Sequence, residues 1–366
     1  MADKIRIGIV GATVTPGGSG WGANAHIPAL RALPDYEVAA VCTAHEETAK
    51  ASAAQFGVDK AYHNINTMAA DPDIDLVVVS VRVPWHKDLV MAALKAGKPV
   101  FCEWPLGANL AEAEEMADFA REHSLRTMVG LQGRSDPAVR YARDLVARGE
   151  IGEVLTANLS ITQAAALERG AGRVWQREAK NGANTLTIAG GHGIDAMCTI
   201  LGEFAEVTAR LQTRITEWKD TDANQMVPVD APDSISVAGR LQGGAEVAVQ
   251  VAAVPSGANG SRLEIYGRTG VIVLQSGGAL STGPNRLYIA KGSDALAEVQ
   301  PPVEFVVTPE GTPAGPPRNV AGGYARFADT TSSGATYEPN FDDAVVRHKL
   351  IDAMERSSKT GTSITL

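Results

Sequence analysis

The chain has 366 residues, of which 45% are hydrophobic and 20% charged, and its 33 basic against 42 acidic side chains give a net charge of −9. This length suggests about two globular domains, and no apolar run approaches the roughly 18 residues that a membrane span needs. An acidic chain without a basic cluster does not suit a nucleic acid, whose binding depends on Lys and Arg at the phosphates. We therefore expect neither a membrane nor a nucleic-acid partner.

The N-terminus and the cysteines indicate where the protein works. The first residues lead directly into a strand-like run and lack the charged, apolar and small-residue order of a signal peptide. Cys42, Cys102 and Cys198 are isolated in sequence, and none belongs to a C-x-x-C pair. Reduced, unpaired cysteines are typical of the cytoplasm, where we expect this protein.

The first 130 residues alternate strand and helix patterns. Helical patterns include 88–96, ended by Gly97, and a helix that begins after Asn109 with Glu112 in a capping-box-like position. Such alternation predicts a parallel sheet wound with crossover helices. The strands are expected at 5–10, 37–42, 75–81, 99–102 and 127–131.

The first expected strand runs into a glycine-rich loop. Gly11 and Thr13 begin it, Gly17, Gly18 and Gly20 to Gly22 follow, and a helical pattern starts near residue 23. Glycines there let backbone amides approach a dinucleotide pyrophosphate, and a helix N-terminus favours the negative charge. The loop is longer than G-x-G-x-x-G, so a glycine-rich turn without a ligand is the alternative. We predict a dinucleotide site with contacts from Gly11, Thr13, Gly20 and Trp21.

Cofactor preference should be set at the tip of the second strand. Thr43, Ala44 and His45 stand where an Asp or Glu would bind the ribose 2′-hydroxyl of NAD, and no Arg is present to favour NADP. Glu46, one residue on, could act as that acid. We expect NAD(P), with a slight preference for NADP, near Thr43 and His45. Alternatively, these are solvent-exposed residues at a helix start.

After about residue 150 the pattern changes to closely spaced strands separated by glycine-containing turns. This predicts a mostly antiparallel sheet. Residues 308–317, rich in Pro and Gly, should form a loop, and 342–356 a helix with Val346, Leu350 and Met354 on one face. The strands are expected at 154–161, 207–215, 234–241, 245–253, 261–266 and 270–274.

Several motifs in both halves of the chain carry a family resemblance. They are the glycine loop, the run 80–86, Ala-Gly-Lys-Pro-Val-Phe-Cys-Glu-Trp-Pro-Leu at 96–106, Gly-Gly-His-Gly-Ile-Asp at 190–195 and Pro-Asn-Phe-Asp-Asp at 339–343. With these motifs the chain resembles the glucose-fructose oxidoreductase, inositol dehydrogenase and rhizopine catabolism family (Gfo/Idh/MocA).

The resemblance implies an NAD(P)-binding Rossmann domain and then an α+β domain on a large, mostly antiparallel open sheet, which carries the substrate site and the oligomer interface. We place the first domain at 1–131 and the second at 132–366, with its C-terminal helix at 342–357. It also implies a homodimer or homotetramer.

Further cofactor contacts are expected at the carboxyl ends of the later strands. Val81 ends the strand expected at 75–81, and Trp85 and His86 follow it, where the crevice of a doubly wound sheet opens. Helix capping is the alternative for His86 and Trp85. The resemblance implies that the backbone near Glu103 contacts the cofactor.

Two departures from the family pattern concern its chemistry. The family's Glu-Lys-Pro reads Glu103-Trp104-Pro105 here, and Ile188 stands where an Asp is expected four residues before His192. Trp after that Glu is most like the branch that holds the fungal galactose-regulon repressor and its bacterial oxidoreductase relatives.

Without the lysine, His192 is the best candidate for moving a proton, since imidazole titrates near neutral pH. Asp195 would orient His192 or bind a substrate hydroxyl, and Lys180 is a candidate for the missing amine. Trp104 offers a flat surface for stacking on substrate or nicotinamide, and Trp175 falls in the substrate-wall segment. Each also has a purely structural interpretation: a hydrogen-bonding His192, a helix-start Asp195, and packing for both tryptophans. The scattered histidines predict no metal site.

These residues favour an NAD(P)-dependent oxidoreductase that transfers hydride to or from a small polar substrate, such as a sugar, polyol, keto or imino compound. The alternative is a non-catalytic NAD(P)-binding sensor or regulator, suggested by the loss of both Lys and Asp. A third possibility is redox-neutral glycoside cleavage with a tightly held NAD.

Overall fold

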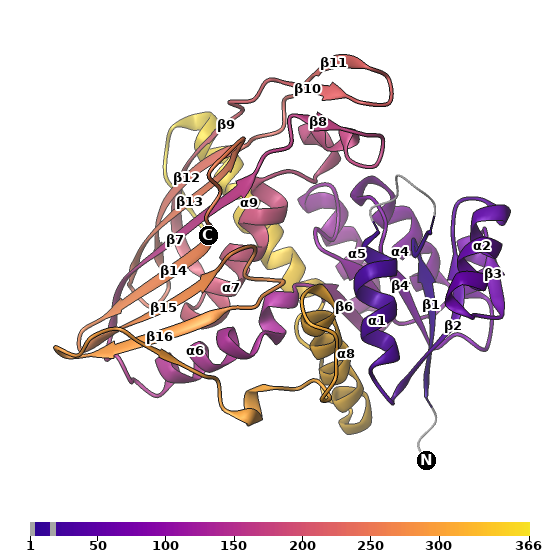
Figure 1. Cartoon of the computed structure of the whole chain (residues 1–366), viewed down its shortest axis with the longest axis horizontal. Coiled ribbons are helices and arrows are strands. Elements are labelled where there is room, and N and C mark those ends of the chain that lie inside the picture. Colours follow the sequence, from indigo (N-terminus) through magenta and orange to yellow (C-terminus); the bar gives the residue numbers. More distant parts are fainter. Residues whose placement is uncertain (1–3, 15–19) are drawn as a thin grey trace. The chain divides into compact units, whose positions relative to one another are not determined.

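The computed structural model describes residues 4–14 and 20–366, and the chain forms two compact units (Figure 1). The first unit combines Met1–Gly130 with Thr308–Val346, and the second combines Leu131–Val307 with Arg347–Leu366. Each unit has its own sheet and its own set of covering helices, so each is described by itself.

The first unit is built on a six-stranded sheet in the order β3-β2-β1-β4-β5-β6, in which every pairing is parallel. The order of the strands reverses between β1 and β4, and doubly wound sheets bind dinucleotides at this switch point. In sheet order the strands are β3 (Lys60–Tyr62), β2 (Tyr36–Cys42), β1 (Ile5–Val10), β4 (Leu76–Val79), β5 (Val100–Glu103) and β6 (Thr127–Gly130).

Helices cover both faces of this sheet, as its continuously apolar strands require. Buried residues of β1, β4 and β5 pack with those of α1 (Ile27–Arg31), α2 (Glu46–Phe56) and α8 (Pro316–Ser333) into one hydrophobic cluster. The remaining crossover helices pack against one another, and they are α3 (Ile65–Ala69), α4 (His86–Lys95) and α5 (Leu110–Glu122). Asn109 caps α5 by accepting from the Glu112 amide, as the sequence predicts.

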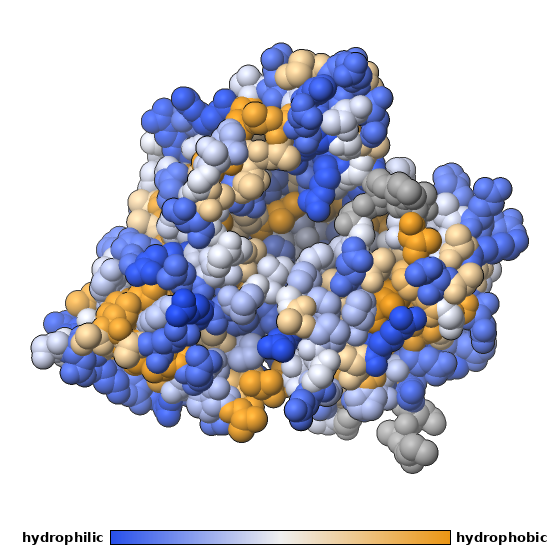
Figure 2. Space-filling view, viewed as in Figure 1, coloured by the Kyte–Doolittle hydropathy of each residue, from blue (hydrophilic) through white to orange (hydrophobic). Residues whose placement is uncertain are grey.

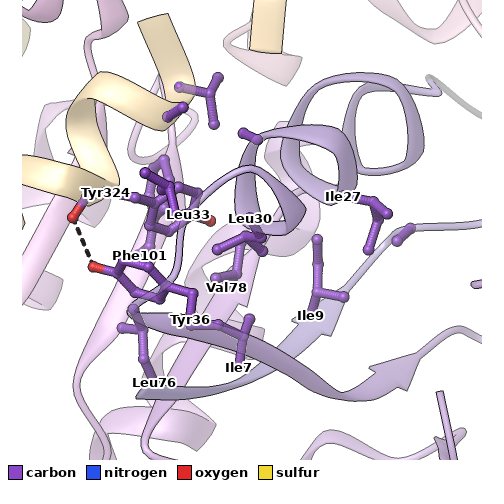
Figure 3. Packing of buried hydrophobic residues seen from close by; sticks show 14 of the residues in the cluster. Ile7, Ile9, Ile27, Leu30, Leu33, Tyr36, Leu76, Val78, Phe101 and Tyr324 are labelled. Carbon is purple, nitrogen blue, oxygen red and sulfur yellow. Dashed lines mark hydrogen bonds between the residues drawn. The ribbon is translucent and has the colours of Figure 1, made fainter. Parts of the chain in front are cut away.

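Residues 308–346 belong to the first unit, whereas the sequence interpretation assigns everything after 131 to the second domain. The reason is the apolar face of α8, from which Tyr324 and Phe327 fill the cluster above the parallel sheet. The Tyr36 hydroxyl donates to the Tyr324 carbonyl at 2.7 Å, the dashed line in Figure 3. The Val129 amide of β6 also donates to the Pro339 carbonyl.

The second unit is built on a nine-stranded sheet in the order β17-β16-β15-β14-β7-β13-β12-β9-β18. All its pairings are antiparallel except that of β7 with β13. In sheet order the strands are β17 (Ala297–Val299), β16 (Arg286–Lys291), β15 (Gly270–Ser276), β14 (Gly260–Gly267), β7 (Val154–Ala164), β13 (Glu246–Val254), β12 (Ser234–Leu241), β9 (Phe204–Gln212) and β18 (Ile364–Thr365).

Helices α6 (Pro137–Ala147), α7 (Gly191–Leu201) and α9 (Phe341–Thr360) lie along one face of that sheet (Figure 1). The strands alternate accordingly: in β12, Ile235 and Val237 are buried while Ser236 and Ala238 are exposed. The predicted fold class, a Rossmann domain followed by a large, mostly antiparallel open sheet, is confirmed.

The ends of several elements differ from the sequence expectation. The helix expected at 23–33 is a π-helical turn, η1 (Gly22–His26), followed by α1. The loop expected at 308–317 ends earlier, because Pro316 begins α8 at a position where proline is tolerated. In α9, Leu350 and Met354 are buried as predicted, but Val346 is 44% exposed.

A small sheet in the second unit was not anticipated at all. Its order is β11 (Gln225–Pro228), β10 (Glu217–Asp220) and β8 (Glu168–Arg169), with β8 parallel to β10. Trp218, Val227 and Val229 form its own apolar cluster.

Hydrophilic residues cover most of the face seen in Figure 2, where apolar residues form only small, scattered groups. Among the helices that the structure describes, none is long and apolar enough to cross a membrane.

The burial of His348 in α9 makes stability depend on pH. Burial lowers the pKa of His348 from 6.5 to about 4. Between these values the unfolded chain binds a proton that the folded chain does not, so stability should fall as the pH drops from 6.5 toward 4, by roughly 3 kcal/mol in total. Urea unfolding at several pH values measures this slope. His348→Gln should flatten it, and the exposed His63→Gln should leave it unchanged; an equal slope in all three proteins would contradict the assignment.

Candidate functional site

The glycine loop follows β1 at the switch point of the parallel sheet. Gly11 has a φ of +99°, and a Cβ there would lie 2.1 Å from the Ser80 carbonyl oxygen at the end of β4. Only glycine fits this position. Gly20 also has a positive φ, of +70°, and Trp21 is the N-cap residue of η1. Gly17 and Gly18 lie outside the described residues.

Two buried polar atoms near this loop support a ligand there. The Trp21 indole Nε1 and the Ser80 hydroxyl have no hydrogen-bond partner within residues 4–14 and 20–366. Buried polar groups in native proteins are nearly always paired, so such atoms point to a bound molecule. With the cradle at Gly11, they fit a dinucleotide whose phosphates are held by backbone amides of the loop. The Thr13 amide is engaged within the loop, where it donates to the Gly11 carbonyl at 2.8 Å.

At the tip of β2, Thr43 shapes the turn. Its hydroxyl lies 3.0 Å from the His45 carbonyl and 2.6 Å from the Thr48 hydroxyl, and the residue is 8% exposed. His45 and Glu46 are the exposed side chains of this tip, and Glu46 forms a salt bridge with Lys50. The strand tip therefore presents His45 toward solvent, and none of the residues 43–45 is acidic.

His86 contacts the two segments that follow β4 and β5. It is 1% exposed, and its ring nitrogens lie 2.9 Å from the Pro105 carbonyl and 3.2 Å from the Val81 carbonyl. Burial lowers its pKa, which keeps the ring neutral. His86 thus fixes the backbone at Val81 and beside Trp104, and its side chain is a positioning group.

Glu103 and Trp104 end β5 in a buried setting. Trp104 is only 5% exposed, so little of the flat surface that the sequence suggests for stacking faces solvent. The Glu103 carboxylate lies 2.8 Å from Nε2 of His26, whose Nδ1 lies 2.8 Å from the Tyr324 hydroxyl. This buried chain ties the Glu-Trp-Pro turn to α8 within the first unit.

In the second unit, His192 lies in the first turn of α7, directly after a second π-helical turn, η6 (Leu186–Gly190). It is partly exposed, while its neighbours are buried. A Cβ on Gly193 would lie 2.3 Å from Cδ1 of Ile161, so glycine lets α7 pack closely on β7. The Gly-His-Gly sequence therefore lets α7 pack closely on the sheet, next to a partly exposed His192 whose Nδ1 is buried.

Asp195, one turn further, is 1% exposed and is held by two arginines. Nη2 of Arg134 lies 2.8 Å from its carboxylate and Nη2 of Arg347 lies 3.4 Å away. Arg347 itself is fully buried and also binds Glu203 at 2.8 Å. Burial raises the pKa of Asp195, but the charges of Arg134 and Arg347 outweigh this and hold it below 3.8. Asp195 is thus an ionised anchor of α7.

A pocket of ≈ 380 Å³ opens one helical turn before His192, and we call it the Arg169 pocket. Ile188, which replaces the family's aspartate, forms part of its wall. Its lining residues are Gln163, Ala164, Ala165, Ala166, Glu168, Arg169, Gly170, Arg173, Gln176, Ala183, Asn184, Thr185, Ile188, Ile215, Trp218, Ala231, Pro232, Asp233 and Ala253.

Two predicted residues lie near this pocket without lining it. Trp175, in the turn η4 (Val174–Arg177), donates from its indole to the Gly172 carbonyl at 2.9 Å. Lys180 has a side chain that is 79% exposed and forms a salt bridge with Glu178. The substrate-wall segment does line the pocket, but through Arg173 and Gln176.

Sequence reasoning missed the arginines of both clusters. Arg169 and Arg173 stand four residues apart just before Trp175, a spacing that was available as a signal. Arg134 stands in the Gln132-Gly-Arg134 run, but nothing in the sequence links it to Arg347 in α9. Within the described part of the chain, no group of His, Cys, Asp and Glu could hold a metal ion.

The fold and the glycine loop define a two-domain protein with a dinucleotide-binding Rossmann domain. Residues 5–131 match the family described as "Oxidoreductase family, NAD-binding Rossmann fold" (Gfo/Idh/MocA), and residues 137–276 match "Gal80p, C-terminal domain". A dehydrogenase of Aspergillus oryzae, aclE, is 34% identical over 99% of this chain and 98% of its own length. The chain belongs to the Gfo/Idh/MocA oxidoreductase family, as its motifs predict.

Two further relatives represent different activities. Levoglucosan dehydrogenase of Pseudarthrobacter phenanthrenivorans is 28% identical over 74% of this chain and 73% of its own. A solved levoglucosan dehydrogenase in complex with NADH and levoglucosan has a TM-score of 0.87 at 24% identity, covering 99% of both chains. A super-repressor mutant of Gal80p from Saccharomyces cerevisiae has a TM-score of 0.86 at 23% identity, covering 99% of this chain and 98% of its own. The fold thus occurs in both dehydrogenases and a regulator.

Gly11 offers a test of the dinucleotide site. Gly11→Ala should weaken binding of NADH and NADPH at least roughly tenfold, because the new Cβ displaces the backbone that contacts the phosphates. Fluorescence titration with either nucleotide measures the dissociation constant. Gly97→Ala is the matched control, since Gly97 has a φ of +75° but no neighbour within 4 Å of its would-be Cβ. Equal affinity in the Gly11 and Gly97 variants would contradict the assignment.

Proposed function

We propose that this protein is an NAD(P)-dependent oxidoreductase that acts on a small polar carbonyl, imino or hydroxyl compound, with His192 as its proton carrier. The observation that carries the proposal is the pairing of a partly exposed His192 with the adjacent Arg169 pocket in the second unit. The glycine loop of the first unit, in an NAD-binding Rossmann fold, supports the cofactor class.

When bound, the nicotinamide cofactor gives hydride to a carbon of the substrate or takes hydride from it. His192 donates a proton to the substrate oxygen or nitrogen on reduction, and accepts it on oxidation. Asp195 acts through α7, because its two arginine partners hold the helix that carries His192. This division of roles needs neither the family lysine nor Lys180.

His192→Phe should lower kcat/KM by about 10²–10⁴-fold while nucleotide affinity stays unchanged, because only the proton carrier is lost. Steady-state assays at 340 nm over a panel of sugars, polyols, keto acids and imino compounds measure the change. The exposed His123→Phe serves as control. Full activity of the His192 variant would remove this histidine from the mechanism, and an inactive wild-type protein over the whole panel would remove the enzyme proposal.

The preference for NADP follows from the strand tip, where no carboxylate on Thr43, Ala44 or His45 repels a 2′-phosphate. We expect NADPH to bind more tightly than NADH. His45→Asp should weaken NADPH at least roughly tenfold relative to NADH, since a carboxylate at the tip repels the phosphate and favours the ribose hydroxyl. His45→Asn introduces a side chain of the same size as aspartate but without its charge, so this variant should keep the wild-type ratio of NADPH to NADH affinity. If both variants bind the two nucleotides alike, residue 45 does not select the cofactor.

A regulatory role is the second candidate, favoured by the match of residues 137–276 to the Gal80p C-terminal domain and by the loss of the family lysine. A regulator binds a protein partner in a nucleotide-dependent manner. Affinity purification with and without NADP, followed by mass spectrometry, separates the two candidates: a nucleotide-dependent partner with no hydride transfer supports the regulator, and turnover without a partner supports the enzyme.

We further propose a homo-oligomer and a cytoplasmic location. The polar, small side chains on the outer face of the nine-stranded sheet, such as Ser236 and Ala248, suit a second copy of the same sheet. Cys42, Cys102 and Cys198 are all buried free thiols, which suits a reducing compartment. Light scattering coupled to gel filtration measures the oligomer.

A further inference from the structure

The Arg169 pocket contains two cations without acidic partners. Among the residues that the structure describes, no carboxylate lies within 4.0 Å of the guanidinium of Arg169 or Arg173, whereas the nearby Arg177 pairs with Glu178 at 2.8 Å. The two acids that line the pocket are engaged elsewhere. Asp233 accepts from the backbone amides of Arg214 and Ile215, and Glu168 binds Lys219.

The guanidinium of Arg169 is held in a fixed plane. Its carbon lies 3.5 Å from the centroid of the Trp218 ring, so the group stacks on the indole face. Nε donates to the Ala166 carbonyl at 3.2 Å and Nη1 donates to Oε1 of Gln176 at 3.1 Å. These contacts orient the group and leave N–H donors of both terminal nitrogens for a ligand. A fixed planar fork is the geometry that binds carboxylates.

The electrostatic setting favours an anion. Arg169 is partly buried, and burial together with the charge of Arg173 lowers its pKa to about 10. Both causes disfavour the cation, and the negative charge of an anion between the two arginines would offset them. The rest of the wall suits a short carbon skeleton, since Ala183, Ile188 and Ile215 are apolar.

We propose that the Arg169 pocket binds the carboxylate of an acidic substrate, a hydroxy, keto or imino acid, through Arg169 and Arg173. This inference rests on the proposed function, because it takes the Arg169 pocket near His192 to be the place where the substrate of the oxidoreductase binds. A neutral sugar would leave both arginines without a partner. The pocket therefore selects acids over the neutral compounds of the same skeleton.

Binding of matched probes to the full chain tests the pocket without turnover. The pairs differ only in a carboxylate: D-glucuronate against D-glucose, D-gluconate against sorbitol, and L-lactate against 1,2-propanediol, followed by isothermal titration calorimetry. In at least one pair the acid should bind tenfold or more tightly than its neutral partner. Parity in all three pairs would overturn the proposal, and so would tighter binding of D-glucose 6-phosphate than of D-glucuronate, which would assign the arginines to a phosphate.

Variants then locate the binding. Arg173→Gln changes an exposed side chain, and Arg169→Lys keeps the charge but loses the fork; each should weaken the acid at least tenfold and leave its neutral partner unchanged. Arg214→Gln, which removes an exposed positive charge beside the pocket residue Ile215, should have no such effect. Equal weakening by Arg214→Gln would overturn the proposal in favour of general charge attraction.

These experiments distinguish a failure of the acidic-substrate proposal from a failure of the proposed oxidoreductase function. Arginine-dependent binding of an acid without any hydride transfer would support the pocket and remove the enzyme. Turnover of a neutral compound with a KM that is unchanged in the Arg169 and Arg173 variants would support the enzyme and overturn the acidic substrate.

Discussion

The second unit depends on one buried charge, the carboxylate of Asp195. A carboxylate that is 1% exposed persists in its ionised form only if cations replace its lost hydration, and Arg134 and Arg347 do so here. Leaving a buried charge without its ionic partners typically costs about 3–5 kcal/mol. The pairing also requires α7, α9 and the segment that holds Arg134 to keep one relative position. The location of His192, three residues before Asp195 on α7, follows from that requirement.

The histidines of this chain differ in their exposure and in their hydrogen-bond partners. His26 and His86 are 0% and 1% exposed, and their ring nitrogens are engaged by Glu103, Tyr324 and backbone carbonyls. They hold the connections at the carboxyl ends of the parallel strands, where a cofactor needs a preformed backbone. His192 alone combines partial exposure with a neighbouring pocket among the histidines that the structure describes. Access, more than residue type, therefore distinguishes His192 as the proposed proton carrier.

How far the sequence predicts this structure depends on the range of the interactions. Local patterns predict well: the apolar runs give five of the six parallel strands and miss only the three-residue edge strand β3, Asn109 and Glu112 begin α5, and the glycine loop follows β1. Long-range packing was not predictable in the same way. The helix α8 returns to the first unit because Tyr324 and Phe327 complete a cluster formed 200 or more residues earlier, and no local pattern shows this. The Arg169 pocket depends on β8, a strand of two residues, pairing with β10 about 50 residues later.

The two departures from the family motif, Trp104 and Ile188, can be explained together by their surroundings in this structure. Trp104 is buried, so the turn after β5 carries no charged group to replace the lysine. Ile188 lines the Arg169 pocket, and an aspartate at that position would place a carboxylate in the same pocket as Arg169 and Arg173. Such a carboxylate would compete with an anionic ligand for the two guanidinium groups. Isoleucine removes that competitor and leaves the positive charge of the pocket to the proposed acidic substrate, while His192 is the proposed proton carrier. Loss of the family acid is therefore the change that a pocket for an acidic substrate requires.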